Sequence, residues 1–414
     1  MRSSRTPEAP HILVFEPDAH GHQMEYLRHL LTKIDQDVPD ARVTLLTTAE
    51  AASHPNCRRL DADFRHLVSV RIAPAVVEGN RLFRAIDVYC ERQWRNAEML
   101  ARGLEQIGVD DVDFVLLPHL EAIGLLHLGL RRNLFRGKPW ATISISVRFH
   151  HRQCGMDGPN GWSDLLQLWA FHRVIRYRRL ACFGSINPYF AQAVPHPKVA
   201  HCPEPGTPPL LASREDACAA YGVRPDTLVV LVFGVIDRRK CVDVLLEGVA
   251  RVVPGLDLTV LLAGPRHAGH LAPVLSSDAA RKLREHGRLI EVDRFILSGQ
   301  DIDPMGAADI VWLFYERNFV ASSSVLVRSA LSRRPVIARR QGVVGRLVEE
   351  HRLGLALGSD APDSIAAALS QLAGDPALRR EMGENGARAF AANTPDNFAR
   401  PIVEAINRAA SGAC

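Results

Sequence analysis

The chain has 414 residues, a formal net charge of +4 at pH 7 and a hydrophobic fraction of 47%. A chain of this length exceeds what one hydrophobic core usually organises, so we expect two domains of about 200 residues each. The charged fraction of 23% is typical of a globular protein. Lysine and arginine form no runs interleaved with aromatic residues, which argues against a nucleic-acid partner.

The eight cysteines are scattered and include no Cys-x-x-Cys pair, so their spacing fits neither a zinc knuckle nor a disulfide framework. Scattered thiols of this kind are typical of reduced proteins, which predicts a cytoplasmic location. Met1–Pro10 carries no hydrophobic signal region. No apolar stretch approaches the roughly 20 residues that span a bilayer.

In the first half of the chain, short apolar runs alternate with helical patterns. This alternation is typical of a parallel sheet with helices on both faces. The expected strands are Ile12–Phe15, Val43–Leu46, Leu67–Ile72, Phe114–Leu117 and Trp140–Ser146. The expected helices are Gln23–Ile34, Gly79–Ile107, Glu121–Leu130 and Gly161–Leu180.

The second half repeats this alternation after a proline-rich segment, Pro195–Pro209, which is expected to link two domains. We expect an α/β protein with a Rossmann-like domain at 1–205, a second at 206–390, and a C-terminal helix at 391–414 that packs back on the first domain. Neither half carries Gly-x-Gly-x-x-Gly or a Walker loop, which disfavours a dinucleotide oxidoreductase and a P-loop NTPase. The expected strands are Leu228–Phe233, Leu258–Ala263, Leu289–Phe295, Ile310–Phe314, Pro335–Ala338 and Leu355–Leu357.

The segment Val229–Lys240 is the most informative part of the sequence. An apolar strand stops at Gly234, and the cations Arg238, Arg239 and Lys240 follow before an amphipathic helix. A strand, a glycine turn, cations and a helix N-terminus together can hold a diphosphate at the carboxyl edge of a parallel sheet. The segment therefore predicts a phosphate site in the second domain.

With this motif the chain resembles GT-B glycosyltransferases, and among them glycosyltransferase family 4, most strongly over Leu228–Gly358. Members of that family carry Gly-Arg-Leu-x-x-x-Lys-Gly after the first strand of the second domain, and Gly234 and Lys240 keep the spacing of its glycine and lysine. Val235 stands in place of the arginine, so one of the two arginines before the lysine is expected to supply that charge. The resemblance implies two Rossmann-like domains that face each other across a cleft.

A second signature lies within Asp309–Val348. A strand is followed by a loop that ends in a serine triplet before an apolar helix, and serine hydroxyls with free backbone N–H groups favour an anion. A later segment, Gln341–Gly345, resembles the glycine loop of the family. The resemblance places the donor diphosphate here, at residues Tyr315, Glu316, Ser322, Ser323, Ser324 and Gly342.

The helix after the serine triplet departs from the family. Many members have two glutamates eight positions apart, the second of which is thought to contact the donor ribose. Arg328 stands at the second position, which reverses the charge, and Glu316 is a candidate for the first. Either the ribose contact comes from elsewhere or the donor differs.

In the first domain, His20, Gly21 and His22 stand where the family has a glycine-rich loop near the acceptor and the donor phosphates. They are candidates for contact with a phosphate or an acceptor hydroxyl. His119 follows a strand, at the edge of the sheet where ligands bind, and matches an active-site histidine of the family. His150, or its neighbour His151, matches a second family histidine.

Two acidic clusters, Asp110–Asp113 and Asp301–Asp303, contain the Asp-x-Asp pattern that holds a metal in other glycosyltransferases. GT-B enzymes instead stabilise the leaving diphosphate with basic residues and helix dipoles, so neither a metal nor another cofactor is expected. Arginines also line one side of the expected helix Gly161–Leu180. They form either a solvated face or a patch for anionic lipid or a phosphorylated acceptor. The arginines in question are Arg173, Arg176, Arg178 and Arg179.

The sequence thus predicts a retaining glycosyltransferase that moves a sugar from a nucleoside-diphosphate sugar to an unidentified acceptor, a glycan, a lipid-linked group or a small molecule. Lys240, an adjacent arginine and the serine triplet would stabilise the departing diphosphate. His119 and His150 are the candidate catalytic residues, and no nucleophile is assigned. Two alternatives remain open: a sugar-nucleotide epimerase on the same fold, and a non-catalytic nucleotide-binding protein.

Overall fold

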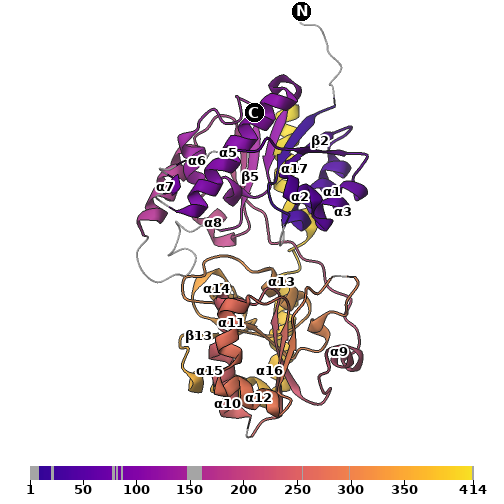
Figure 1. Cartoon of the computed structure of the whole chain (residues 1–414), viewed down its shortest axis with the longest axis vertical. Coiled ribbons are helices and arrows are strands. Elements are labelled where there is room, and N and C mark those ends of the chain that lie inside the picture. Colours follow the sequence, from indigo (N-terminus) through magenta and orange to yellow (C-terminus); the bar gives the residue numbers. More distant parts are fainter. Residues whose placement is uncertain are drawn as a thin grey trace, which may run out of the picture. The chain divides into compact units, whose positions relative to one another are not determined.

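The computed structural model describes residues 9–19, 23–76, 80, 83–84, 87–146, 161–253, 255–297 and 299–412. These residues form two compact units (Figure 1). The N-terminal unit comprises the described residues up to 205 together with 395–412, and the C-terminal unit comprises 206–394. Across the described residues, no helix combines the length and the apolar character needed to cross a membrane.

The N-terminal unit is built on a seven-stranded sheet in the order β3-β2-β1-β4-β5-β6-β7, and every pair of neighbouring strands is parallel. Parallel strands bury both faces, which explains why its central strands are continuous apolar runs. The strands are β1 (His11–Phe15), β2 (Arg42–Thr47), β3 (Val68–Ile72), β4 (Phe114–Leu117), β5 (Trp140–Ser144), β6 (Leu180–Ser185) and β7 (Val199–His201).

Helices cover both faces of this sheet and enclose two hydrophobic cores. Side chains of α1, α3 and α17 pack on one face, and those of α5, α6, α7 and α8 pack on the other. The helices are α1 (Gln23–Asp37), α2 (Ala49–Ser53), α3 (Pro55–Asp63), α5 (Val88–Ile107), α6 (Leu125–Leu130), α7 (Trp162–Val174), α8 (Pro188–Ala193) and α17 (Pro395–Ala410), with the 3-10 turns η1 (Val109–Asp111) and η2 (Leu120–Ala122).

The last helix, α17, belongs to the N-terminal unit although the chain reaches it from the C-terminal unit. Its apolar face is fully buried, and the ring of Phe398 lies 5.1 Å from that of Tyr26 on α1. Asp396, in its first turn, forms an ion pair with Lys33 of α1. This hydrogen-bonded lysine lowers the pKa of the Asp396 carboxyl.

The C-terminal unit has a six-stranded parallel sheet in the order β10-β9-β8-β11-β12-β13. Its strands are β8 (Leu228–Phe233), β9 (Leu258–Ala263), β10 (Leu289–Val292), β11 (Ile310–Leu313), β12 (Val336–Arg339) and β13 (Gly354–Leu357). Its helices are α9 (Arg214–Tyr221), α10 (Val242–Val252), α11 (Ala268–Leu275), α12 (Asp278–Glu285), α13 (Ser324–Leu331), α14 (Gly342–His351), α15 (Pro362–Gly374) and α16 (Pro376–Ala389), with the 3-10 turns η3 (Arg238–Lys240) and η4 (Pro304–Gly306).

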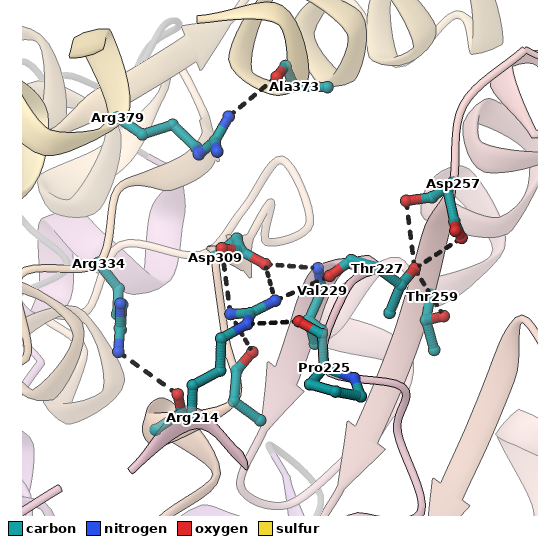
Figure 2. Close-up of polar contacts among 12 residues, drawn as sticks. Arg214, Pro225, Thr227, Val229, Asp257, Thr259, Asp309, Arg334, Ala373 and Arg379 are labelled. Carbon is teal, nitrogen blue, oxygen red and sulfur yellow. Dashed lines mark hydrogen bonds and ion pairs between the residues drawn. The ribbon is translucent and has the colours of Figure 1, made fainter. Parts of the chain in front are cut away.

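A polar network fixes the amino-terminal end of this second sheet. The Arg214 guanidinium, at the start of α9, faces the Asp309 carboxylate before β11 and bonds it at 2.9 and 3.2 Å (Figure 2). The same guanidinium donates to the Thr227 carbonyl, and Asp309 accepts the backbone N–H of Val229 on β8. The network therefore ties α9 to two neighbouring strands at the edge opposite their carboxyl ends.

Two of the sequence expectations about elements are wrong. The expected helix Gly161–Leu180 ends at Val174, and its last residue instead opens β6. The small residues and the glycine of β6 give no period that separates a strand from a helix. β7 lies inside the expected linker; it is a three-residue edge strand, where flanking prolines are tolerated. Of the long helix expected over Gly79–Ile107, α5 covers Val88–Ile107; Phe83 and Arg84 are helical as well, and residues 77–79, 81–82 and 85–86 lie outside the described residues.

Candidate functional site

The carboxyl end of β8 turns sharply at Gly234, which has a φ of +86°. The next strand, β9, ends at a second glycine, Gly264, with a φ of +143°. A Cβ added at Gly264 would lie 2.1 Å from the carbonyl oxygen of Gly234, so only glycine fits. Gly234 was predicted from the sequence, and Gly264 was not. The feature of the sequence that indicates Gly264 is its position directly after a buried strand.

Lys240 lies over the carboxyl edge of the sheet at the point where strand order changes direction. Its side chain is buried, and its ammonium donates a 2.6 Å hydrogen bond to the carbonyl of Phe233, the last residue of β8. The same ammonium lies 5.5 Å from the ring centroid of Tyr315, which follows β11. Lys240 thus stands between β8 and β11, where ligands bind in doubly wound sheets.

The two arginines before Lys240 differ in their surroundings. Arg239 bonds the carboxylate of Asp237, and this contact raises the pKa of its guanidinium. The backbone carbonyl of Arg239 accepts the N–H of Glu316, which holds Glu316 near the turn. The side chain of Glu316 is half-buried. Arg238 is exposed, and the structure gives its side chain no hydrogen bond or ion pair with any described residue.

The predicted loop after β11 is held by its own aromatic and hydroxyl groups. The ring of Tyr315 stacks on Phe319 at 4.2 Å, and its hydroxyl lies 2.9 Å from that of Ser323. Ser323 is the N-cap of α13, where its side chain accepts the N–H of Leu326. Ser322 and Ser324 flank this cap, so the whole triplet lies at the N-terminus of α13.

Arg328, the position of charge reversal, has a partner within the same unit. Its guanidinium bonds the Asp303 carboxylate at 2.6 and 3.0 Å and lies 5.0 Å from the ring centroid of Phe233. Asp303 is buried and also caps the short turn η4. Arg328 is therefore paired with the buried carboxylate of Asp303, so a substitution of either residue leaves the other without its ion-pair partner.

Arg339 is a further residue at the carboxyl edge of the second sheet, and it was not predicted from the sequence. It ends β12, is buried, and donates a 2.7 Å hydrogen bond to the carbonyl of Tyr315. Its guanidinium lies 4.1 Å from the ring centroid of Phe314. The available signal is a charged residue that closes an otherwise apolar strand. Gly342, with a φ of +77°, begins α14 just beyond it.

In the N-terminal unit, His119 lies just past β4, as predicted, at the N-cap position of the short turn η2, where its side chain makes no capping hydrogen bond. Its Nε2 is 3.5 Å from Oε2 of Glu121. The other oxygen of Glu121 accepts bonds from the Ser144 hydroxyl and from the backbone N–H groups of Ile145 and Ser146 after β5. Glu121, which sequence reasoning did not single out, thus joins the ends of β4 and β5 beside His119.

Glu16 follows β1 and is the second unpredicted acid at this edge. Its side chain is fully buried, and burial raises the pKa of its carboxyl well above the usual value, with Asp18 and Glu121 adding to the rise. One carboxyl oxygen accepts the backbone N–H of Asp18 at 3.2 Å. The predicted residues His20, Gly21, His22 and His150, with His151, lie outside the described residues.

The two Asp-x-Asp clusters make contacts within their own unit. Asp113 accepts the backbone N–H of His11, and Asp301 bonds Arg294 and the N–H of Leu297, contacts that lower the pKa of the Asp301 carboxyl. In the part of the chain that the structure describes, no three His, Cys, Asp or Glu side chains form a group that could hold a metal ion.

Comparison with protein-family models finds no match. Among curated proteins, a D-inositol 3-phosphate glycosyltransferase from Corynebacterium urealyticum is 26% identical over 209 residues, which are 48% of this chain and 47% of that protein. The chain thus matches about half the length of this curated relative.

Solved structures match nearly the whole chain. Sucrose-phosphate synthase from Thermosynechococcus elongatus superposes with a TM-score of 0.69 at 15% identity, over 98% of this chain and 100% of its own. HepE from Anabaena, in complex with UDP, has a TM-score of 0.67 at 15% identity, over 96% of this chain and 99% of its own. A further HepE structure holds UDP-glucose. The two parallel-sheet units and these similarities show that the chain has the GT-B fold, the fold of the glycosyltransferases that it resembles.

Proposed function

We propose that the protein is a glycosyltransferase that moves a sugar from a nucleoside-diphosphate sugar to an acceptor with retention of configuration. The observation that carries the proposal is the buried Lys240, fixed between the ends of β8 and β11 beside the glycine turn at Gly234. The HepE structures that match this fold hold UDP or UDP-glucose. A uridine nucleotide is therefore the first donor to test.

The donor diphosphate would lie against this edge of the C-terminal unit. Lys240 and Arg238 supply positive charge, and the cap at Ser323 opens a helix N-terminus that favours an anion. These groups would stabilise the negative charge that develops as the sugar–phosphate bond breaks. We propose that they do so without a bound metal, since Asp301 and Asp303 are already engaged with Arg294 and Arg328.

His119 is proposed to act at the acceptor side of the reaction. Its imidazole lies 3.5 Å from the Glu121 carboxylate, which would orient the ring and favour one tautomer. It would then accept a hydrogen bond from a hydroxyl near the reacting carbon. His150 and the segment His20–His22 remain candidates from the sequence alone. We also propose the domain limits predicted from the sequence, 1–205 and 206–390, and a cytoplasmic location.

The test is a screen of nucleotide sugars with and without a panel of sugar, cyclitol and lipid-linked acceptors. The proposal predicts release of nucleoside diphosphate that depends on the acceptor, with the anomeric configuration of the product, read by NMR, equal to that of the donor. Release of a free epimer of the sugar would favour the epimerase. Tight binding of nucleotide with no turnover would favour the non-catalytic alternative.

We also propose that the N-terminal unit contacts anionic lipid through α7. This helix exposes apolar side chains to solvent, among them Trp162 at 86%, with Leu166 at 51% and Trp169 at 43%. Basic residues follow directly, and a pocket lined in part by Arg178, Arg179 and Lys138 lies near the start of β5. An apolar helix face beside a cationic cluster is suited to an anionic membrane surface.

Sedimentation with vesicles tests this contact. Vesicles of phosphatidylglycerol and phosphatidylcholine should carry down the protein, and pure phosphatidylcholine should carry down far less. The double variant Trp162→Ser/Leu166→Ser should lose most of the bound fraction, whereas Leu210→Ser, which alters a fully exposed leucine in the other unit, should not. Equal sedimentation with both vesicle types would contradict the proposal.

A further inference from the structure

The first sheet changes direction between β1 and β4, because β2 and β3 lie on one side of this pair and β5 to β7 lie on the other. In such sheets ligands bind beyond the carboxyl ends of the strands at this point. Glu16 directly follows β1, and Glu121 lies in the turn after β4. The switch point of the N-terminal unit is therefore flanked by two carboxyl groups.

Both carboxyl groups carry an oxygen atom that has no hydrogen-bond partner. These atoms are Oε2 of Glu16 and Oε2 of Glu121, and each is buried; Oε2 of Glu121 has an ion-pair contact with Nε2 of His119 at 3.5 Å but no hydrogen bond. The side-chain oxygen of Gln23, the first residue of α1, is buried and unpaired as well. Buried polar atoms in folded proteins are nearly always paired. The two unpaired carboxyl oxygens, one after β1 and one after β4, thus point to a ligand that brings donors.

The charge of this edge restricts the ligand further. Burial, with the neighbouring acids, raises the pKa of the Glu16 carboxyl. Among the described residues, no lysine or arginine bonds or ion-pairs with the side chain of Glu16 or Glu121; the basic group in contact is His119. A phosphate group offers acceptors and negative charge, and would meet acceptors and negative charge here.

We propose that Glu16 and Glu121 form a subsite for the hydroxyl groups of an uncharged sugar or cyclitol, and that this subsite rejects the phosphorylated form of the same ring. The inference rests on the proposed glycosyltransferase function and names the class of acceptor. Ring hydroxyls donate to the unpaired oxygens of Glu16 and Glu121. The site would differ in this respect from the relative named for D-inositol 3-phosphate.

The test compares matched ligand pairs, glucose with glucose 6-phosphate and myo-inositol with inositol 3-phosphate, by NMR titration in the presence of UDP. The expected result is that a neutral member binds at least about tenfold more tightly than its phosphate, since the phosphate brings further acceptors and negative charge to the carboxyl oxygens. Tighter or equal binding of the phosphate overturns the proposal. So does a lack of binding by every neutral member.

Two isosteric variants locate the subsite. Glu121→Gln and Glu16→Gln should each weaken binding of the neutral ligand at least about fivefold, while Glu50→Gln, an exposed glutamate of α2, should not. Thermal unfolding shows whether each variant is folded. Two variants are made so that the test can still be carried out if one of them does not fold. Unchanged affinity in both folded variants overturns the assignment. UDP is titrated separately, so a failure of the donor proposal appears as lost UDP binding, whichever ligand the carboxyl groups prefer.

Discussion

The ammonium of Lys240 and the carbonyl of Phe233 form a 2.6 Å hydrogen bond that closes the turn after β8. The bond fixes the position of a buried cation at the carboxyl edge of the sheet, under the ring of Tyr315. A cation held in place before a ligand arrives loses little freedom on binding it. Lys240 is therefore the residue on which the proposed donor site depends most.

Arg238 and Arg239 provide a matched pair of substitutions. Arg238→Met should weaken donor binding about five- to tenfold, because its exposed guanidinium has no partner among the described residues and is available to a phosphate. Arg239→Met should have a smaller effect, since that guanidinium is engaged with Asp237. Titration with UDP measures both. A larger loss for Arg239→Met would reverse the assignment of the two arginines.

Arg328 should not tolerate a glutamate, the residue that the resemblance to glycosyltransferase family 4 implies at this position. Arg328→Glu places a carboxylate beside the buried Asp303 and is expected to lower the free energy of unfolding by about 3 kcal/mol. The charge swap Arg328→Glu/Asp303→Arg should recover part of that loss, because opposite charges face each other again. Urea unfolding of the two variants measures this difference. A single variant as stable as the parent protein would show that the pair is not coupled.

The Arg214–Asp309 pair should contribute to the stability of the C-terminal unit. Arg214→Ala removes a two-bond contact with a mostly buried carboxylate (Figure 2). We expect a loss of about 2 kcal/mol in the free energy of unfolding. Arg281→Ala is the matched control, because its partner Asp278 is on the exposed surface of the same helix, α12. Equal stability of the two variants in urea would contradict the role given to Arg214.

Stability should fall with rising pH because of Glu204. Burial raises the pKa of this carboxyl to about 7, whereas an unfolded glutamate titrates near pH 4.3. Between these values the folded state binds more protons than the unfolded state, so the free energy of unfolding decreases as pH rises, by about 4 kcal/mol in all. Glu204→Gln removes this contribution and keeps an acceptor for the Tyr26 hydroxyl.

Urea unfolding at pH 5 and pH 8 checks the prediction for Glu204. The parent protein should lose more stability between these values than the glutamine variant does. Glu16, whose pKa is also raised by burial, contributes to both proteins alike and cancels in the comparison. The same loss in the two proteins would show that Glu204 titrates normally.

The sequence was sufficient to predict the fold and the glycine turn after β8 because both depend on local patterns. Apolar runs identified the central strands, and Gly234 with Lys240 marked the turn between a strand and a helix. The pairing of Arg328 with Asp303 could not be predicted in this way, since it joins segments that the sequence does not connect. The same holds for Glu121, because the groups that its carboxylate bonds lie at the end of β5.

The short edge strand β7 illustrates a second limit. Its residues, Val199–His201, lie in a proline-rich segment that has the composition of a linker. They form a strand because the neighbouring β6 offers backbone partners, beginning with the pair Phe183 and Val199. Pairing with a neighbour is a tertiary effect that outweighs local composition in so short a strand.

The most direct test of the account is a calorimetric titration of UDP into the parent protein, Lys240→Met and Lys282→Met. Lys282 is an exposed lysine of α12 and serves as the control for loss of one positive charge. With thermal unfolding confirming that all three are folded, we expect Lys240→Met to bind UDP about 10- to 100-fold more weakly than the parent, and Lys282→Met to bind it equally well. Equal affinity of the folded Lys240→Met variant would contradict the assignment of the donor site.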